Sequence, residues 1–188
     1  IIGAGVVGGM VASALSKYDI KICILEKQND VAMGATRANS AIVHAGFDAK
    51  EGTLKARFNV RGSEMMEEDA ARLGVKYKRN QSLVVGFEHE RAEVEAIYKR
   101  GLKNGVKGLR LIEKEELQTL EPNLNPELSC ALLAETGAIV CPFHMTMAFA
   151  ENAFENGVEF FLNTNVEKIE KAEKNNTTIN KKNNNKKN

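Results

Sequence analysis

Three glycines near the start of the chain have the spacing of a phosphate-binding turn. Residues 3–8 read Gly-Ala-Gly-Val-Val-Gly and match the pattern G-x-G-x-x-G. In such a turn Gly3 allows a tight bend after a strand, Gly5 lets a pyrophosphate approach the backbone, and Gly8 lets a helix pack closely on the strand. The N-terminus of that helix would direct free N–H groups and the positive end of its dipole toward the phosphates.

An acidic residue follows at the distance expected for contact with a nucleotide ribose. Residues 1–4 indicate the end of a strand, residues 6–16 carry apolar side chains at helical spacing, and residues 21–26 contain an unbroken apolar run typical of a buried parallel strand. Glu26 ends that strand, and its carboxylate would accept hydrogen bonds from both ribose hydroxyls and repel a 2′-phosphate, which disfavours NADP. The pattern therefore predicts a dinucleotide-binding βαβ unit, which by itself does not separate NAD from FAD.

A run of small and polar residues after this unit favours FAD. Residues 35–46 read ATRANSAIVHAG, where an NAD-binding domain would usually continue with further βα units. Small residues allow the backbone to approach a flat ligand, and Thr36, Asn39 and Ser40 offer hydrogen-bonding groups for phosphate or flavin edge atoms. An NAD-binding dehydrogenase domain remains an alternative, which a comparison of FAD and NADH titrations would distinguish.

The same segments resemble the FAD-dependent oxidoreductases of the D-amino-acid oxidase superfamily. The branch most similar holds L-2-hydroxyglutarate oxidases and bacterial glycerol-3-phosphate dehydrogenase-like proteins. The similarity is carried by GAGVVG, ILEK, ATRANSAIVHAGFDAKEGTLKA and ETGAIVCPFHMTMAFAENAFENGVEFFLNTNVEKIE. It runs from Ile1 to about Glu170 and covers the N-terminal half of a protein that in the family is about twice as long. It implies an α/β fold, namely a Rossmann-like FAD-binding domain with an inserted α+β substrate domain, truncated in this chain, and FAD as the cofactor.

The resemblance also implies which residues would bind FAD. They are Gly3, Gly5, Gly8, Glu26, Lys27, Thr36, Asn39, Ser40 and Val166. The glycines would face the pyrophosphate, Glu26 the adenosine ribose and Lys27 the adenine-side rim. The polar residues of the small-residue segment would line the pyrophosphate and the flavin approach, and Val166 would hold adenine through its backbone.

His44 is the candidate catalytic residue. The family transfers a hydride from a carbon bearing a hydroxyl or an amine to flavin N5, and the protein supplies orientation and electrostatics. By the resemblance His44 lies where the isoalloxazine and substrate approach, so it could orient the substrate or accept the hydroxyl proton. A structural hydrogen-bonding role is the alternative. Arg57 and Arg61, one helical turn apart, could contact an anionic substrate or the cofactor phosphates, although a solvated face with nearby glutamates is the simpler interpretation.

Four segments are expected along the chain. Residues 1–73 form the FAD-binding βαβ unit and flavin approach, residues 74–135 a substrate-domain insert, and residues 136–170 the return to the FAD-binding domain. Residues 171–188 are rich in Asn and Lys and are expected to be disordered, because they carry almost no apolar surface to bury. Such an abrupt end suggests a truncated or frame-shifted product, which would be a catalytically incomplete N-terminal fragment that at most binds FAD.

Composition describes a globular protein. The 188 residues are 43% hydrophobic and 27% charged, and no apolar run approaches the roughly 20 residues that cross a bilayer. A formal net charge of +1 gives no indication of a nucleic-acid surface. Cys23, Cys130 and Cys141 lack the paired spacing of a zinc site, which predicts reduced thiols in a cytoplasmic protein and no metal site. The expected partner is a small hydroxy-acid or polyol-phosphate substrate, and the electron acceptor is left open.

Overall fold

The computed structural model describes residues 1–171 and 177–183. By contacts the chain divides into two compact units. The first unit contains Ile1–Ser40, Leu73–Val75 and the described part of Cys141–Asn188, and the second contains Ala41–Arg72 and Lys76–Val140. Among the described residues, none of the helices combines the length and the apolar character needed to cross a bilayer.

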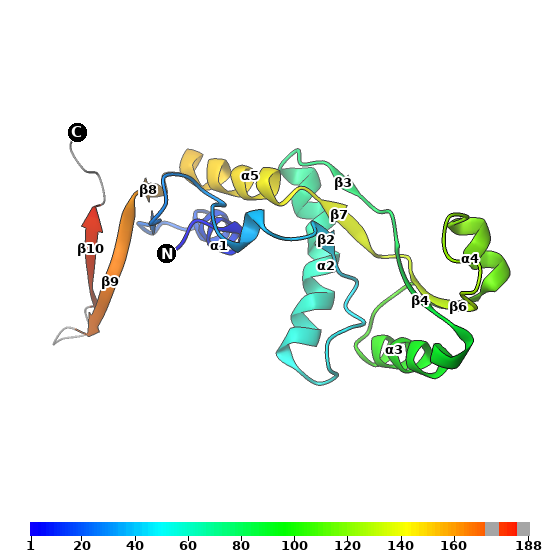
Figure 1. Cartoon of the computed structure of the whole chain (residues 1–188). Helices are drawn as coiled ribbons and strands as arrows, with labels where there is room; N and C mark the ends of the chain where they lie inside the picture. The colour runs from blue at the N-terminus through cyan, green and yellow to red at the C-terminus, as the bar shows by residue number, and fades with distance from the viewer. Residues whose placement is uncertain (172–176, 184–188) are drawn as a thin grey trace. The chain divides into compact units, whose positions relative to one another are not determined.

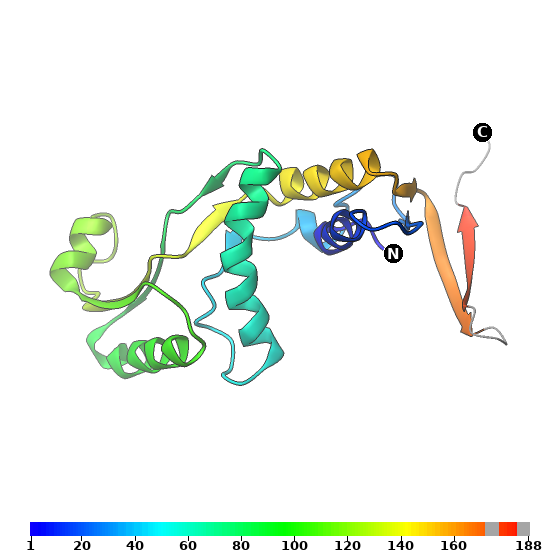
Figure 2. The same cartoon turned by 180° about the vertical axis from the view of Figure 1, so that it is seen from behind.

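The first unit is built on a small parallel sheet. Strand β1 (Cys23–Leu25) pairs in parallel with β8 (Glu159–Phe161), and Ile2 makes a parallel bridge with Leu25 on the other side. Helix α1 (Val6–Leu15) follows the glycine turn and packs against α5 (Pro142–Glu155), as both cartoon views show (Figure 1 and Figure 2). The βαβ unit and the α/β class predicted from the sequence are therefore confirmed.

Small residues allow the two helices to lie close together. A Cβ added at Gly9 of α1 would lie 3.4 Å from the Cβ of Phe149 in α5. Behind this contact, Ala12, Ile24 and Ala153 form the centre of the apolar core of the unit. A short 3-10 helix, η1 (Ala35–Arg37), completes the part of the unit that matters for the candidate site.

An antiparallel hairpin follows β8. Strand β9 (Thr164–Lys171) pairs with β10 (Thr177–Asn183), with an irregularity in register at Asn180 and Lys181. Residues 177–183 lie within the segment expected to be disordered and form strand β10, while the expectation for residues 171–188 as a whole stays a prediction. Pairing along β9 satisfies the backbone N–H and C=O groups of a polar segment without requiring apolar side chains. The remainder of that expectation, residues 172–176 and 184–188, lies outside the described residues.

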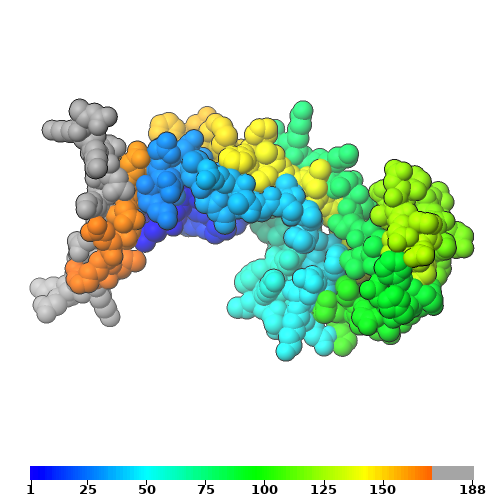
Figure 3. All heavy atoms as spheres, in the orientation of Figure 1, coloured from blue at the N-terminus to red at the C-terminus, as the bar shows by residue number. Residues whose placement is uncertain are grey.

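The second unit contains an antiparallel sheet in the order β4-β6-β5, formed by Ser82–Gly86, Cys130–Ala134 and Leu109–Glu113. All residues of β6 are buried, and they alternate between two cores as the period of a strand requires. Leu132 and Ala134 pack with Val94 of α3 (Arg91–Lys103), whereas Leu133 packs with Leu117 of α4 (Lys114–Leu120). The atoms of α3 and α4 form much of the visible surface of this part of the unit (Figure 3). A 3-10 turn, η2 (Glu88–Glu90), precedes α3.

The remaining strands of the second unit form a sheet in the order β2-β7-β3, from Ile42–Val43, Ala138–Val140 and Tyr77–Lys78. Helix α2 (Leu54–Arg72) begins after Thr53, whose Oγ1 accepts a hydrogen bond of 3.2 Å from the N–H of Ala56. Threonine is among the residues preferred at the N-cap of a helix, where its hydroxyl accepts a hydrogen bond from an N–H of the first turn. Gly74, with φ +67°, lies two residues after the end of the helix, where glycine readily adopts this left-handed conformation.

The two units do not coincide with the boundaries expected after residues 73 and 135. Residues 41–72 belong to the second unit, because β2 pairs with β7 along Ile42–Ile139 and Val43–Ala138. Strand β7 also lies in the second unit, since it pairs with β3. The pairing of β2 with β7, which are nearly one hundred residues apart in sequence, therefore decides where the two units divide.

Candidate functional site: a dinucleotide cradle

Each of the three glycines in the turn occupies a position that disfavours a side chain. Gly3 has φ +96°, in the region that favours glycine, and its N–H donates to the carbonyl of Leu25 at 2.8 Å. A Cβ added at Gly8 would lie 2.0 Å from the carbonyl oxygen of Gly3. A Cβ at Gly5 would lie 3.1 Å from Oγ1 of Thr36. The turn is therefore closed tightly on itself and exposes backbone, as a pyrophosphate site requires.

Glu26 joins the end of β1 to this turn. Its Oε2 accepts a hydrogen bond of 2.7 Å from the N–H of Ala4, and its Oε1 accepts one of 2.9 Å from the N–H of Gln28. Its carbonyl accepts a 2.7 Å bond from the N–H of Thr164 at the start of β9. Each carboxylate oxygen can accept a second hydrogen bond, so the group keeps acceptors for ribose hydroxyls while it positions the turn.

Thr36 supplies a side-chain acceptor at the start of α1. Gly5, the N-cap of that helix, has no side chain to offer. The Oγ1 of the buried Thr36 accepts a 3.1 Å hydrogen bond from the N–H of Val6. The Asn39 amide in turn donates to the carbonyls of Ala35 and Thr36 and so holds η1 together. The small-residue segment therefore supports the glycine turn directly.

Two hollows in the first unit contain most of the residues predicted to bind the cofactor. A cleft of about 490 Å³ is lined by Gly3, Gly5, Gly8, Glu26, Lys27 and Thr36. A smaller hollow of about 260 Å³ is lined by Val166 together with Gly3, Glu26 and Lys27. Together they form what we call the cradle. Sequence analysis did not single out Gln28, Gly34 and Ala35, which also line the larger cleft. They lie two to nine residues after Glu26 along the chain, and this closeness to a predicted binding residue was the available signal.

Asn39 and Ser40 do not line either hollow, and both side chains are exposed. His44 belongs to the second unit, where it directly follows β2. Val43 and Ala45 on either side of it are buried, and the alternation of an extended chain leaves the His44 side chain exposed. A catalytic role for His44 stays a prediction.

The tight glycine turn, the carboxylate at the end of β1 and the hollow beside Val166 fit a dinucleotide. The model of the FAD dependent oxidoreductase family matches residues 1–187. The chain belongs to this family. FAD, the cofactor predicted from the sequence, is the cofactor of the family, and the resemblance noted from the motifs is confirmed.

Similar proteins include dehydrogenases and oxidases that are named for glycerol 3-phosphate or L-2-hydroxyglutarate. It is 45% identical over 174 residues to a glycerol 3-phosphate dehydrogenase of Caloramator mitchellensis, covering 92% of this chain and 36% of that protein. It is 36% identical over 182 residues to the mitochondrial L-2-hydroxyglutarate dehydrogenase of Bos taurus, covering 92% and 37%. The FAD-bound L-alpha-glycerophosphate oxidase of Mycoplasma pneumoniae matches with a TM-score of 0.90 and 30% identity, over 95% of this chain and 47% of that one. The chain thus spans less than half the length of these three proteins.

Proposed function

We propose that this chain carries the FAD-binding part of an enzyme that oxidises a small hydroxy substrate, either glycerol 3-phosphate or a 2-hydroxy acid. The observation that supports the FAD role is the cradle, in which Glu26 bonds to the glycine turn at 2.7 Å while lining both hollows. The substrate class is supported by the dehydrogenases that the chain resembles at 45% and 36% identity. FAD, when bound, accepts the hydride that the substrate carbon gives up.

In this proposal the residues of the cradle bind and orient the cofactor. The N–H groups of the first turn of α1 would bind the pyrophosphate, and Glu26 would accept hydrogen bonds from the ribose hydroxyls. Lys27 would lie at the adenine-side rim, and the backbone of Val166 would hold adenine. Thr36 would act at the pyrophosphate, since its hydroxyl already lies at the N–H of Val6.

The polar residues that do not line the cradle have other proposed roles. Asn39 and Ser40 would bind toward the flavin approach, and both have exposed side chains that leave them accessible to a ligand. The exposed imidazole of His44 would orient the substrate or accept its hydroxyl proton. We also propose a cytoplasmic location, because Cys23, Cys130 and Cys141 are free thiols.

A titration of the purified chain with FAD, followed by quenching of flavin fluorescence, tests the cofactor role. We expect saturable binding of FAD and a yellow protein, with NADH binding much more weakly. A colourless protein that binds no added FAD would refute the proposal. Preferential binding of NADH would favour an NAD-binding dehydrogenase domain instead.

A second measurement separates an active enzyme from a chain that binds FAD without turnover. The latter alternative is favoured by the coverage, since the chain spans 36% of the length of the glycerol 3-phosphate dehydrogenase. Turnover of glycerol 3-phosphate or L-2-hydroxyglutarate with a dye as electron acceptor would show a complete site. In that case His44→Gln should abolish most of the turnover and leave FAD affinity unchanged. FAD binding without turnover would establish the alternative.

A further inference from the structure

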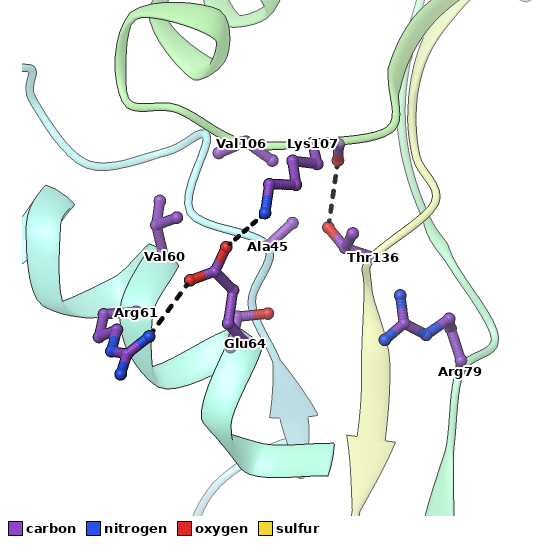
Figure 4. A pocket seen from close by; sticks show the side chains of 9 residues that line it. Ala45, Val60, Arg61, Glu64, Arg79, Val106, Lys107 and Thr136 are labelled. Carbon is purple, nitrogen blue, oxygen red and sulfur yellow. Dashed lines mark hydrogen bonds and ion pairs between the residues drawn. The ribbon is translucent and has the colours of Figure 1, made fainter. Parts of the chain in front are cut away.

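A cleft in the second unit brings together three cations from separate elements. It has a volume of about 450 Å³, within the range of small-molecule sites. Arg61 lies on α2, Arg79 in the connection between β3 and β4, and Lys107 in the connection between α3 and β5. Figure 4 shows these side chains around the cleft. Their positions along the sequence are far apart, so the fold creates this concentration of positive charge.

Two carboxylates form ion pairs with these three cations. Nζ of Lys107 lies 3.0 Å from Oε1 of Glu64, and Nη1 of Arg61 lies 3.9 Å from Oε2 of the same residue. Arg79 pairs with Glu67. The five side chains of these ion pairs, three cations and two carboxylates, thus carry one unit of positive charge together. Glu64 is shared, and its contact with Arg61 is long for a hydrogen bond.

The cationic groups keep donors for a ligand. The Arg61 side chain is 67% exposed and that of Lys107 is 80% exposed, so both can turn toward an incoming anion. An arginine has five N–H donors and a lysine three, and each uses only part of them here. A phosphate oxygen pair is well matched to a guanidinium fork, which Arg79 could present while it still contacts Glu67.

The rest of the cleft suits a ligand that has a short carbon stem. Ala45 and Val106 are buried beneath it and, with Val60, provide an apolar surface. Ser63 and Thr136 also line the cleft and bring hydroxyl groups to it. Oγ1 of Thr136 lies 3.5 Å from the carbonyl oxygen of Lys107, which is a long and therefore weak hydrogen bond. Cations at the mouth and apolar side chains below match a charged head group attached to a small carbon chain.

We propose that this cleft binds a small phosphate monoester dianion and that Arg61, Arg79 and Lys107 recognise its phosphate. All of its lining residues belong to the second unit, and none of them lines the cradle of the first. The inference therefore does not depend on the proposed FAD role. It also gives Arg61 a role beyond the exposed ion pair with Glu64.

Titration of the full chain with methyl phosphate and with inorganic phosphate, by calorimetry at low ionic strength, tests the site. We expect saturable binding of both, with methyl phosphate tighter because its carbon contacts the apolar surface. Arg79→Gln and Lys107→Gln should each weaken binding by about fivefold, as expected for the loss of one exposed charge-assisted contact. Added salt should weaken binding as well.

Lys99→Gln is the matched control. Lys99 lies on α3 in an exposed ion pair with Glu95, at 3.6 Å, and does not line this cleft. It should bind methyl phosphate like the unmodified chain, and all three variants should keep the same FAD affinity. Methyl phosphate should also shift the NMR signals of the Val60 and Val106 methyl groups in the unmodified chain. This measurement does not require any variant to fold. Absence of saturation, absence of these shifts, or an equal loss in Lys99→Gln would each show that the proposal is wrong.

Discussion

Gly8→Ala should damage the cradle more than any other single-methyl change in the glycine turn. The added Cβ would lie 2.0 Å from the carbonyl oxygen of Gly3 and 3.1 Å from its carbonyl carbon. Nonbonded heavy atoms prefer separations of about 3.5–4.0 Å, so the overlap with the oxygen exceeds about 1 Å. The neighbour is backbone rather than the end of a flexible side chain. Relief therefore requires α1 to move away from the turn.

The magnitude follows from this overlap. Forcing a methyl group into a tightly packed site costs about 1–3 kcal/mol, and a backbone clash favours the upper part of this range. For a chain of this size, such a loss lowers the melting temperature by about 2–12 °C. The same movement displaces the N–H groups at the start of α1, and an equal loss in binding would lower FAD affinity by about 5- to 150-fold. Thermal unfolding by circular dichroism and FAD titration by fluorescence measure the two effects.

Gly62→Ala is the control for this experiment. Gly62 lies within α2, and an added Cβ there would have no heavy atom within 4 Å. Replacing a helical glycine with alanine at an open position should stabilise the protein by about 0.4–1 kcal/mol and leave FAD affinity unchanged. If Gly8→Ala instead kept the melting temperature and FAD affinity of the unmodified chain, the reasoning about the closed turn would be refuted.

Three further predictions concern packing, capping and charge. Thr36→Val removes the acceptor of the Val6 N–H and should lower the free energy of unfolding, measured by urea denaturation, by about 1–3 kcal/mol. Thr36→Ser keeps a hydroxyl and should recover this stability. An equal loss of stability in both variants would contradict this prediction. Leu132→Ala, at a fully buried position of β6, should lower the free energy of unfolding by about 2–5 kcal/mol. The midpoint of urea unfolding should fall while the dependence of the free energy on urea concentration stays unchanged. A smaller loss of stability would show that the core collapses around the gap. The hydrogen bonds from Arg91 hold the pKa of Glu113 below its ordinary value of 4.5, so Arg91→Gln should raise that pKa in an NMR titration. A carboxyl whose pKa is lowered on folding stabilises the folded state above its unfolded pKa, and this stabilisation is lost as the pH falls through the folded pKa. The unmodified chain should therefore lose the contribution of Glu113 only below about pH 4.5. An unchanged pKa of Glu113 in the variant would contradict the assignment.

The sequence by itself determined the features that depend on neighbouring residues. The glycine spacing from Gly3 to Gly8 and the acid at Glu26 were sufficient to predict the βαβ unit. Turns, caps and apolar periodicity act over a few residues, so their signals can be recognised in the order of the amino acids.

Only the tertiary structure decided which distant segments meet. The hydroxyl of Thr36 reaches the N–H of Val6 across 30 positions, and β2 joins β7 instead of remaining with the first unit. The pairing of β10 with β9 also joins two segments whose contact no local pattern in the sequence indicates. The cations around Glu64 likewise come from separate elements. These contacts depend on where the folded chain returns in space, and a pattern read along the sequence contains no direct signal for the partner of each group.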